Sequence, residues 1–268
     1  MDSSYRQATL DLAKEAALDA GRLLRENFRT DFRISKKGPI DFVTEMDLKS
    51  ERLILDRICS AFPDHRILAE EAGANTNDSP FNWLVDPLDG TTNYAHGFPT
   101  FCVSIALEYY GKLETGVIYD PMADELFAAS RGGGAFLNDR PIRVSEEDHL
   151  SESLLGTGFS YDPRGMRVNL ALFHEFMTRA AGVRRVGSAA RDLSSVASGR
   201  FDGVWEYQLH PWDVAAGMLL VEEAGGKVTD FDGGSCSPRD SRILLTNGRI
   251  HDAMLRVLQD QAPVINKV

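Results

Sequence analysis

Two carboxylates flank a proline in the segment Trp83–Gly97, which reads WLVDPLDGTTNYAHG. Asp86 ends an apolar run, and Asp89 follows it just before Gly90 and Thr91. Because Pro, Asp and Gly are common turn formers, the segment by itself predicts a turn. Carboxylates, backbone amides next to a glycine and a hydroxyl group also suit metal-assisted phosphate chemistry. The residue types therefore favour either a plain turn or a metal-dependent site.

Further acids stand where predicted strands end or predicted helices begin, namely Asp47, Glu70, Glu71 and Asp213. Each has an ordinary structural explanation, such as a capping box for Asp47 or the helix dipole for Asp213. A divalent cation such as Mg²⁺ takes carboxylate oxygens, waters and substrate phosphate as ligands. We expect these acids to converge with the first pair, although spacing alone leaves the structural explanation open.

The elements that position these residues are predicted from hydrophobic periodicity. In the first half, helices are expected over Ser4–Phe28 and Thr44–Phe62, with strands over Phe101–Tyr109, Val117–Tyr119 and Leu126–Ala129. The run Arg131–Gly134 predicts a turn or bulge, because it lacks the Lys-Ser/Thr of a phosphate-binding P-loop.

Helices and strands alternate in the second half of the chain. The expected order is helix Phe173–Ala180, strand Val183–Val186, helix Asp192–Ala197, strand Phe201–Tyr207, helix Trp212–Ala224 and strand Lys227–Phe231. This order predicts an α/β (α+β) protein built in layers of helix and sheet. We expect an N-terminal α+β subdomain over residues 1–145, which carries most of the candidate metal ligands, and a C-terminal α/β subdomain over residues 146–268.

The chain is acidic, with 29 Lys and Arg against 40 Asp and Glu and a net charge of −11. Bulk electrostatics therefore disfavour nucleic acid and anionic membranes as partners, and an anionic substrate requires a local source of positive charge. The sequence shows neither a signal peptide nor an apolar run of the ~18 residues that a membrane span needs. Three widely separated cysteines, Cys59, Cys102 and Cys236, predict a reducing compartment, the cytoplasm.

The segment WLVDPLDGTTN, Trp83–Asn93, resembles the first signature of the inositol monophosphatase family. That family shares a superfamily with fructose-1,6-bisphosphatases. The segment WDVAAGMLLVEEAGG, Trp212–Gly226, is similar to the second signature. Shorter similarities occur at DFVTEMD (Asp41–Asp47), ILAEE (Ile67–Glu71) and VGSAA (Val186–Ala190), so the resemblance covers nearly the whole chain in order and spacing. It implies a layered αβαβα sandwich of the sugar-phosphatase type, Mg²⁺ dependence, lithium sensitivity and a homodimer.

The resemblance also implies a metal site with two to three Mg²⁺ ions. Its expected ligands are Glu70, Asp86, the Leu88 carbonyl, Asp89 and Asp213. Asp86 is expected to bridge two ions, and a third, weaker ion to lie near Glu70 with Asp47 in its outer shell. Leu88 stands where the family often has isoleucine, which is harmless if only its carbonyl group binds.

Catalytic and substrate-binding roles are implied in the same way. Asp47, Glu70 and Thr91 are the expected catalytic residues, with Thr91 bonded to Asp47 and orienting the attacking water. The expected substrate contacts are Asp89, the amides of Gly90 and Thr91, Ala189, Glu206 and Asp213. Lys36 matches a lysine of a loop near the site, whereas Ser188 and Arg191 occupy positions where family members differ.

We therefore expect a Mg²⁺-dependent phosphomonoester hydrolase, most simply an inositol-1-monophosphatase acting on a small phosphorylated polyol or sugar. Fructose-1,6-bisphosphatase activity, alone or as a dual activity, requires cations for a second phosphate, and the candidates are Arg184, Arg185 and Arg191. Nucleotide 3′-phosphatase and histidinol-phosphatase activities fit the VGSAA segment less well. A regulatory binding protein on a phosphatase fold is the alternative of a different class, and it predicts broken metal ligands.

Overall fold

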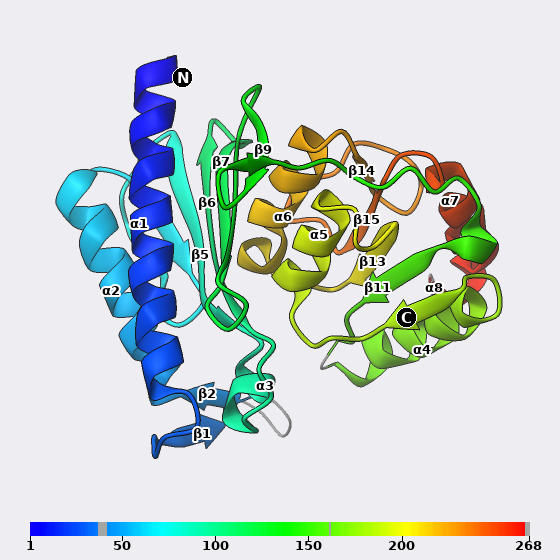
Figure 1. The fold of residues 1–268 in the computed structure, drawn as a ribbon, viewed down its shortest axis with the longest axis horizontal. Coiled ribbons are helices and arrows are strands. Elements are labelled where there is room, and N and C mark those ends of the chain that lie inside the picture. The colour runs from blue at the N-terminus through cyan, green and yellow to red at the C-terminus, as the bar shows by residue number, and fades with distance from the viewer. Residues whose placement is uncertain (37–41, 161, 266–268) are drawn as a thin grey trace.

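The computed structural model describes residues 1–36, 42–160 and 162–265, without the side chains of Lys36 and Val264. Helices and sheets alternate in layers, as Figure 1 shows. Helices α1 (Ser3–Asn27) and α2 (Glu45–Ala61) cover one face of the larger sheet, and α5 (Ala189–Ala197) and α6 (Pro211–Glu223) lie between the two main sheets. The predicted αβαβα architecture is confirmed.

The larger sheet has eight strands in the order β10-β9-β8-β7-β6-β5-β3-β4. Its strands are β3 (Arg66–Ala69), β4 (Gly73–Ala74), β5 (Phe81–Asp89), β6 (Cys102–Tyr109), β7 (Lys112–Asp120), β8 (Glu125–Ser130), β9 (Gly134–Leu137) and β10 (Arg140–Pro141). All neighbours are antiparallel except β3 and β5. A separate hairpin pairs β1 (Ile34–Lys36) with β2 (Phe42–Thr44), and α3 (Thr91–Ala95) follows β5.

The second main sheet has five strands in the order β12-β11-β13-β15-β14. Its strands are β11 (Leu154–Thr157), β12 (Gly182–Arg184), β13 (Gly203–Tyr207), β14 (Lys227–Thr229) and β15 (Arg242–Thr246). The remaining helices are η1 (Leu150–Glu152), α4 (Pro163–Met177), α7 (His251–Asp260) and α8 (Ala262–Ile265). Helices α4, α7 and α8 cover the outer face of this sheet (Figure 1).

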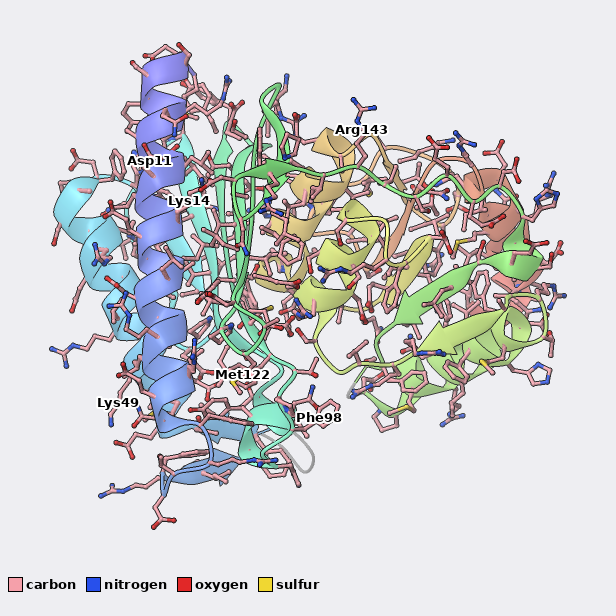
Figure 2. The ribbon with its side chains drawn as sticks, viewed as in Figure 1. Asp11, Lys14, Lys49, Phe98, Met122 and Arg143 are labelled. Atoms are coloured by element: carbon pink, nitrogen blue, oxygen red, sulfur yellow. The ribbon has the colours of Figure 1, made fainter. Side chains whose placement is uncertain are left out.

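Small apolar residues let α1 and α6 pack closely on the larger sheet. The buried stripe of α1 is formed by Ala13, Ala16, Ala17, Ala20 and Leu24, as the periodicity predicts. Polar side chains such as Asp11 and Lys49 lie on the outer surface of the α1/α2 layer (Figure 2). Helix α6 is apolar all round because sheets cover it on both sides. A Cβ on Gly116 of β7 would lie 3.0 Å from the Ala216 carbonyl oxygen, so a larger residue would push α6 away from the sheet.

The structure differs from the sequence expectations at several elements. Helix α4 begins at Pro163 rather than Phe173, because Asp162 caps it and proline suits the first helical position. Strands β9, β11 and β15 and helix α7 were not predicted. The run Arg131–Gly133 forms a turn, as expected. No helix in the described ranges has both the length and the apolar character that crossing a bilayer requires.

Candidate active site

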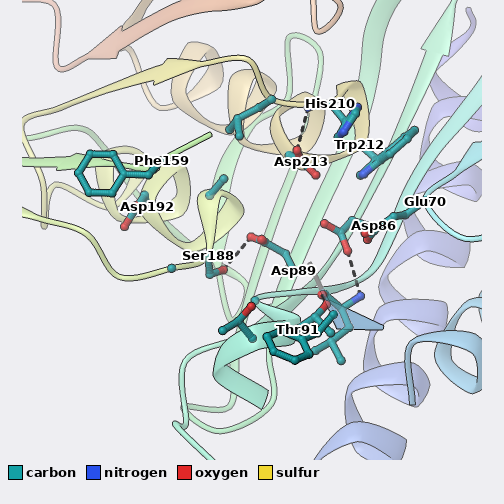
Figure 3. Close-up of a pocket in the computed structure, with 18 of the residues that line it drawn as sticks. Glu70, Asp86, Asp89, Thr91, Phe159, Ser188, Asp192, His210, Trp212 and Asp213 are labelled. Carbon is teal, nitrogen blue, oxygen red and sulfur yellow. Dashed lines mark hydrogen bonds between the residues drawn. The ribbon is translucent and has the colours of Figure 1, made fainter. Parts of the chain in front are cut away.

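A cleft of about 150 Å³ lies at the ends of β5, α3, α5 and α6. It brings together four of the predicted acids, Glu70, Asp86, Asp89 and Asp213, with Thr91 beside them (Figure 3). Glu70 follows β3, and its backbone N–H donates to Val85 of the neighbouring strand β5 at 3.1 Å. Segments far apart in the chain therefore deliver carboxylates to one place.

A β-bulge in β5 orients the first two carboxylates. Asp86 pairs with Ser104 and Asp89 pairs with Cys102, so β5 contains one residue more than its partner β6 between these pairs. Side chains alternate along a regular strand, and residues three apart face opposite sides. The extra residue cancels that alternation and puts both carboxylates on the cleft side. The turn predicted for this segment is wrong, because the strand continues to Asp89.

The bulge explains the proline at its centre. Pro87 has no N–H to donate, and a bulge is one of the few sheet positions where none is needed. The Pro87 carbonyl accepts a hydrogen bond from the Ser50 hydroxyl on α2 at 2.7 Å, and the Leu88 N–H donates to Asp86 Oδ1 at 3.0 Å. The segment is thus fixed from both sides.

Backbone N–H groups at two helix starts hold Asp89 and Asp213 in place. Asp89 Oδ2 accepts hydrogen bonds from the Ser188 hydroxyl and from the N–H of Ala190, both at 2.7 Å. Asp89 therefore caps α5, which belongs to the second layer of helices. Asp213 Oδ2 accepts from the N–H of His210 at 2.8 Å, at the start of α6. In each case one carboxylate oxygen is used within the protein, which leaves the second for a ligand.

Burial and mutual repulsion disfavour the charged form of these acids. Burial raises the pKa of Asp86 and of Asp213 well above its ordinary value, and neighbouring carboxylates raise both further. Burial also raises the pKa of Asp89 to about 6, against the opposing effect of the Ser188 hydrogen bond. The donor set is carboxylate and carbonyl oxygen, as hard divalent cations prefer. A cation would relieve the repulsion, so the residues fit such an ion.

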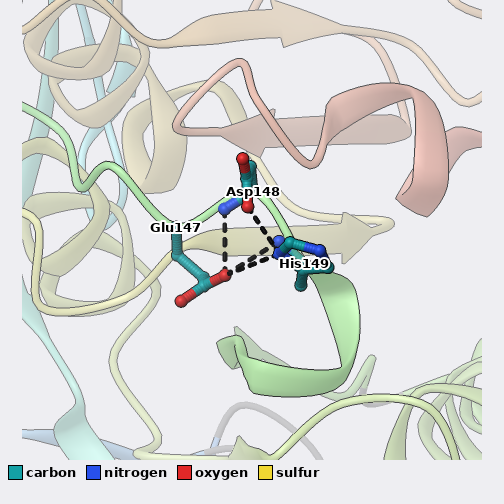
Figure 4. Close-up of side chains that lie close together, drawn as sticks. All are labelled: Glu147, Asp148 and His149. Carbon is teal, nitrogen blue, oxygen red and sulfur yellow. Dashed lines mark hydrogen bonds and ion pairs between the residues drawn. The ribbon is translucent and has the colours of Figure 1, made fainter.

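A separate acidic group lies on the surface. Among the described residues, only Glu147, Asp148 and His149 form a group of three His, Cys, Asp or Glu ligand atoms mutually within 4.8 Å (Figure 4). Glu147 Oε1 accepts from the two N–H groups that follow it, at 2.9 and 2.8 Å. These local hydrogen bonds account for the grouping of the three side chains, none of which lines the cleft.

Asp47 and Thr91 form a pair behind the carboxylates. Asp47 is the N3 residue of the capping box of α2 and is fully buried. Its Oδ1 lies 2.8 Å from Thr91 Oγ1, and its Oδ2 accepts from the N–H and the hydroxyl of Thr44. Burial raises the pKa of Asp47 to about 6. The Thr91 hydroxyl also lies 3.0 Å from the Leu88 carbonyl oxygen, so its single proton is shared between two acceptors.

Gly90 has a backbone conformation that other residues rarely adopt. It precedes α3 with φ of +99°, and a Cβ there would lie 3.0 Å from the Thr100 carbonyl oxygen. The positive φ and this close contact with Thr100 together favour glycine at the position.

Of the residues predicted to contact the alcohol part of the substrate, two line the cleft and one is buried behind its wall. Ala189 and Asp213 line the cleft. Glu206 on β13 is fully buried behind the wall, where its Oε2 accepts from the Gly158 N–H at 3.1 Å. Burial raises the pKa of Glu206 to about 8. The side chain of Lys36 lies outside the described residues.

Sequence reasoning missed several residues of the lining, namely Phe42, Phe159, Asp192, His210 and Trp212. No motif marks Phe159, and Asp192 looks like an ordinary acid of a first helical turn. Of the three candidate arginines only Arg185 lines the cleft. Arg191 is instead paired with Asp120 at 3.0 Å and with Glu125 at 3.3 Å.

The chain is similar to proteins of known family over almost its full length. Residues 6–262 match the model of the inositol monophosphatase family. An inositol-1-monophosphatase of Mesorhizobium japonicum is 45% identical over 95% of this chain and 97% of its own length. The Nus factor SuhB of Escherichia coli is 43% identical over 94% of this chain and 96% of its own length.

Solved structures give the same result. The inositol monophosphatase of Anabaena superposes with a TM-score of 0.87 at 49% identity, covering 95% of this chain and 96% of that one. The extragenic suppressor protein suhB of Bartonella henselae superposes with a TM-score of 0.90 at 44% identity, covering 94% and 98%. The fold is therefore common to these proteins.

Proposed function

Because the chain belongs to the inositol monophosphatase family, we propose that it hydrolyses myo-inositol 1-phosphate to myo-inositol and phosphate with the help of Mg²⁺. The observation that carries this proposal is the β5 bulge, which turns Asp86 and Asp89 toward the same cleft as Glu70 and Asp213. Four acids in one cleft of an acidic protein are unfavourable unless a cation is their partner.

Two to three Mg²⁺ ions are the proposed cofactors. Their proposed ligands are Glu70, Asp86, the Leu88 carbonyl, Asp89 and Asp213. When bound, such ions supply positive charge beside the phosphate and lower the pKa of a coordinated water. The hydrogen bonds to Ser188 and Ala190 keep Asp89 in one orientation, because they fix one of its two oxygens.

The chain itself orients the reacting groups. The Thr91 hydroxyl donates its hydrogen bond to Asp47 and the Leu88 carbonyl, so the lone pairs of Thr91 Oγ1 are available to accept a hydrogen bond from the attacking water. The amides of Gly90 and Thr91 are proposed to hold the phosphate, where the glycine conformation allows close approach. The alcohol portion then faces Ala189 and Asp213, with Glu206 behind the wall.

A sugar bisphosphate is the main alternative substrate. It would require positive charge for a second phosphate, and Arg185 is the only one of the three candidate arginines that lines the cleft. One exposed arginine favours a monophosphate. We expect a panel of phosphomonoesters at fixed Mg²⁺ to give the highest kcat/KM for inositol 1-phosphate. A preference for fructose 1,6-bisphosphate would reverse this order, and activity that resists EDTA would contradict the metal assignment.

A binding role beside catalysis is the second candidate function. It is favoured by relatives at 43% identity that are named Nus factor SuhB. The test is the recovery of a stoichiometric partner by the purified chain, followed by the same recovery with Asp89→Asn. Binding that survives this substitution while turnover is lost would separate the two roles.

Lithium inhibition and a homodimer are proposed from the family resemblance. The cytoplasmic location is proposed from the wide spacing of Cys59, Cys102 and Cys236, which are free in the structure. Sedimentation at equilibrium would distinguish a dimer from a monomer, and a lithium titration of the activity would measure inhibition.

A further inference from the structure

Asp192 is a buried carboxyl group without a hydrogen-bond partner at the edge of the cleft. It lies in the first turn of α5, is 1% exposed and lines the cleft together with Phe159 and Ala189 (Figure 3). Among the described residues neither of its oxygens has a partner. Buried polar groups are almost always hydrogen-bonded, because leaving one unpaired costs free energy. The position therefore requires an explanation.

Glu206 adds a second unsatisfied carboxyl oxygen nearby. Its Oε2 accepts from the Gly158 N–H, whereas Oε1 has no partner among the described residues. Burial raises the pKa of Asp192 well above its ordinary value, and the neighbouring Glu206 raises it further. Helix α5 thus places Asp192 on the side of the cleft away from Asp86 (Figure 3), and strand β13 places the incompletely satisfied Glu206 near it, behind the cleft wall.

The surroundings favour a hydroxyl group over a cation as the missing partner. Arg185 also lines the cleft, and its positive charge lowers the pKa of Asp192. That charge repels a second cation at this place, while it does not oppose a neutral hydroxyl. Phe159 provides an apolar surface beside the carboxyl group. An alcohol with several hydroxyl groups on an apolar ring frame matches both features.

We infer that Asp192 is a specificity-determining residue whose carboxyl group accepts a hydrogen bond from a hydroxyl group of the alcohol that carries the phosphate. The inference rests on the proposed function, because it concerns the substrate of that same cleft. It adds Asp192 to the residues on the alcohol side and explains why the helix start at Ala189 carries a buried acid.

The test compares two substrates in the full chain with Mg²⁺. Myo-inositol 1-phosphate offers hydroxyl groups to the carboxyl group, and phenyl phosphate offers none. Asp192→Ala is expected to lower kcat/KM for inositol 1-phosphate by about tenfold, as the loss of one hydrogen bond predicts. For phenyl phosphate the change is expected to stay within about twofold, because that alcohol makes no such bond. Asp192→Asn keeps one acceptor oxygen and is expected to lie between the wild type and Asp192→Ala.

Thermal unfolding of the substrate-free protein separates recognition from a structural role. Removing an unpaired buried carboxyl group is expected to leave the Tm unchanged or to raise it. Asp202→Ala is the matched control, since Asp202 is also a buried acid of this part of the chain. It accepts from the Ser145 hydroxyl at 2.5 Å and the Leu154 N–H at 2.7 Å, so its loss should lower the Tm without changing substrate preference.

Each outcome decides the matter. An equal loss on both substrates, an unchanged preference, or a drop in Tm like that of Asp202→Ala overturns the assignment of Asp192. Preference for an aminoalkyl phosphate that disappears in Asp192→Ala overturns the choice of a hydroxyl group. A wild-type protein that hydrolyses neither substrate, nor any other phosphomonoester, overturns the proposed function itself.

Discussion

The Thr91 hydroxyl oxygen lies 2.8 Å from Oδ1 of Asp47, and the second oxygen of that carboxylate is held by Thr44. The capping box of α2 therefore does two things at once. It satisfies the first turn of the helix, and it fixes the rotamer of a hydroxyl group at the cleft. Asp47 is therefore both the capping residue of α2 and a residue of the site.

Replacing the Thr91 hydroxyl tests this pair. Thr91→Val keeps the shape of the side chain but removes the group that accepts from the water. We expect kcat to fall by about 10²-fold or more, since positioned proton acceptors contribute on this scale. Thr91→Ser is the control and should retain most of the activity. Equal activity of the valine and serine variants in steady-state assays would contradict the role of Thr91.

The glycine before α3 allows a prediction with an internal control. Gly90→Ala combines a positive φ with a contact of 3.0 Å to Thr100, whereas Gly111→Ala meets a similar φ of +73° with no atom within 4 Å. We expect both to lose roughly 1 kcal/mol of stability from backbone strain. Only Gly90→Ala should lose more than that and raise KM for the phosphate substrate. Equal denaturation midpoints and equal KM values for the two variants would contradict this assignment.

The raised pKa values predict how stability depends on pH and on divalent ions. The pKa of Asp89 is raised from 3.8 to about 6, so the native protein holds this proton more tightly than the unfolded chain does. The stability that protonated Asp89 contributes is complete below the pKa of this group in the unfolded chain, and it is lost as the pH rises through about 6. Buried Glu206 has a pKa raised to about 8, so the stability that its protonated form contributes is lost at higher pH, as the pH rises through about 8.

Without divalent ions we therefore expect the Tm to fall between about pH 5 and about pH 8. Mg²⁺ binds the deprotonated carboxylates, so the Tm increase that it produces should be larger at the higher pH. Thermal scans in EDTA and in Mg²⁺ at both pH values measure this difference. The same Mg²⁺-induced increase at both values would contradict a site formed by these acids.

Helix periodicity was sufficient to predict α1 and α2, whose buried stripes are long and regular. The short strands β9 and β11 were missed because four residues with glycine at a central or terminal position give no alternation to detect. The expected start of helix α4 is too late because its first turns carry few apolar residues, and even the buried side includes Gly165 and Asn169.

The acids of the site were identified from the sequence, but their arrangement was not. Pro87 and Gly90 are turn formers, and the local composition of Asp86–Thr91 predicts a turn. Only pairing with β6 reveals that the extra residue is a bulge inside a strand. Asp192 was missed for a similar reason, because an acid near a helix start is ordinary until its burial and its unpaired oxygens are known.

The most direct test of a metal-dependent phosphatase site is Asp89→Asn, assayed for turnover, Mg²⁺ binding and thermal stability together. The asparagine oxygen can still accept from Ser188 and Ala190, so the cap of α5 and the fold should be preserved. The negative charge is lost, and we expect Mg²⁺ binding to weaken and hydrolysis of inositol 1-phosphate to disappear, with the Tm unchanged or higher. Near-normal turnover by the folded variant would contradict the assignment of Asp89 and of the cleft as the metal site.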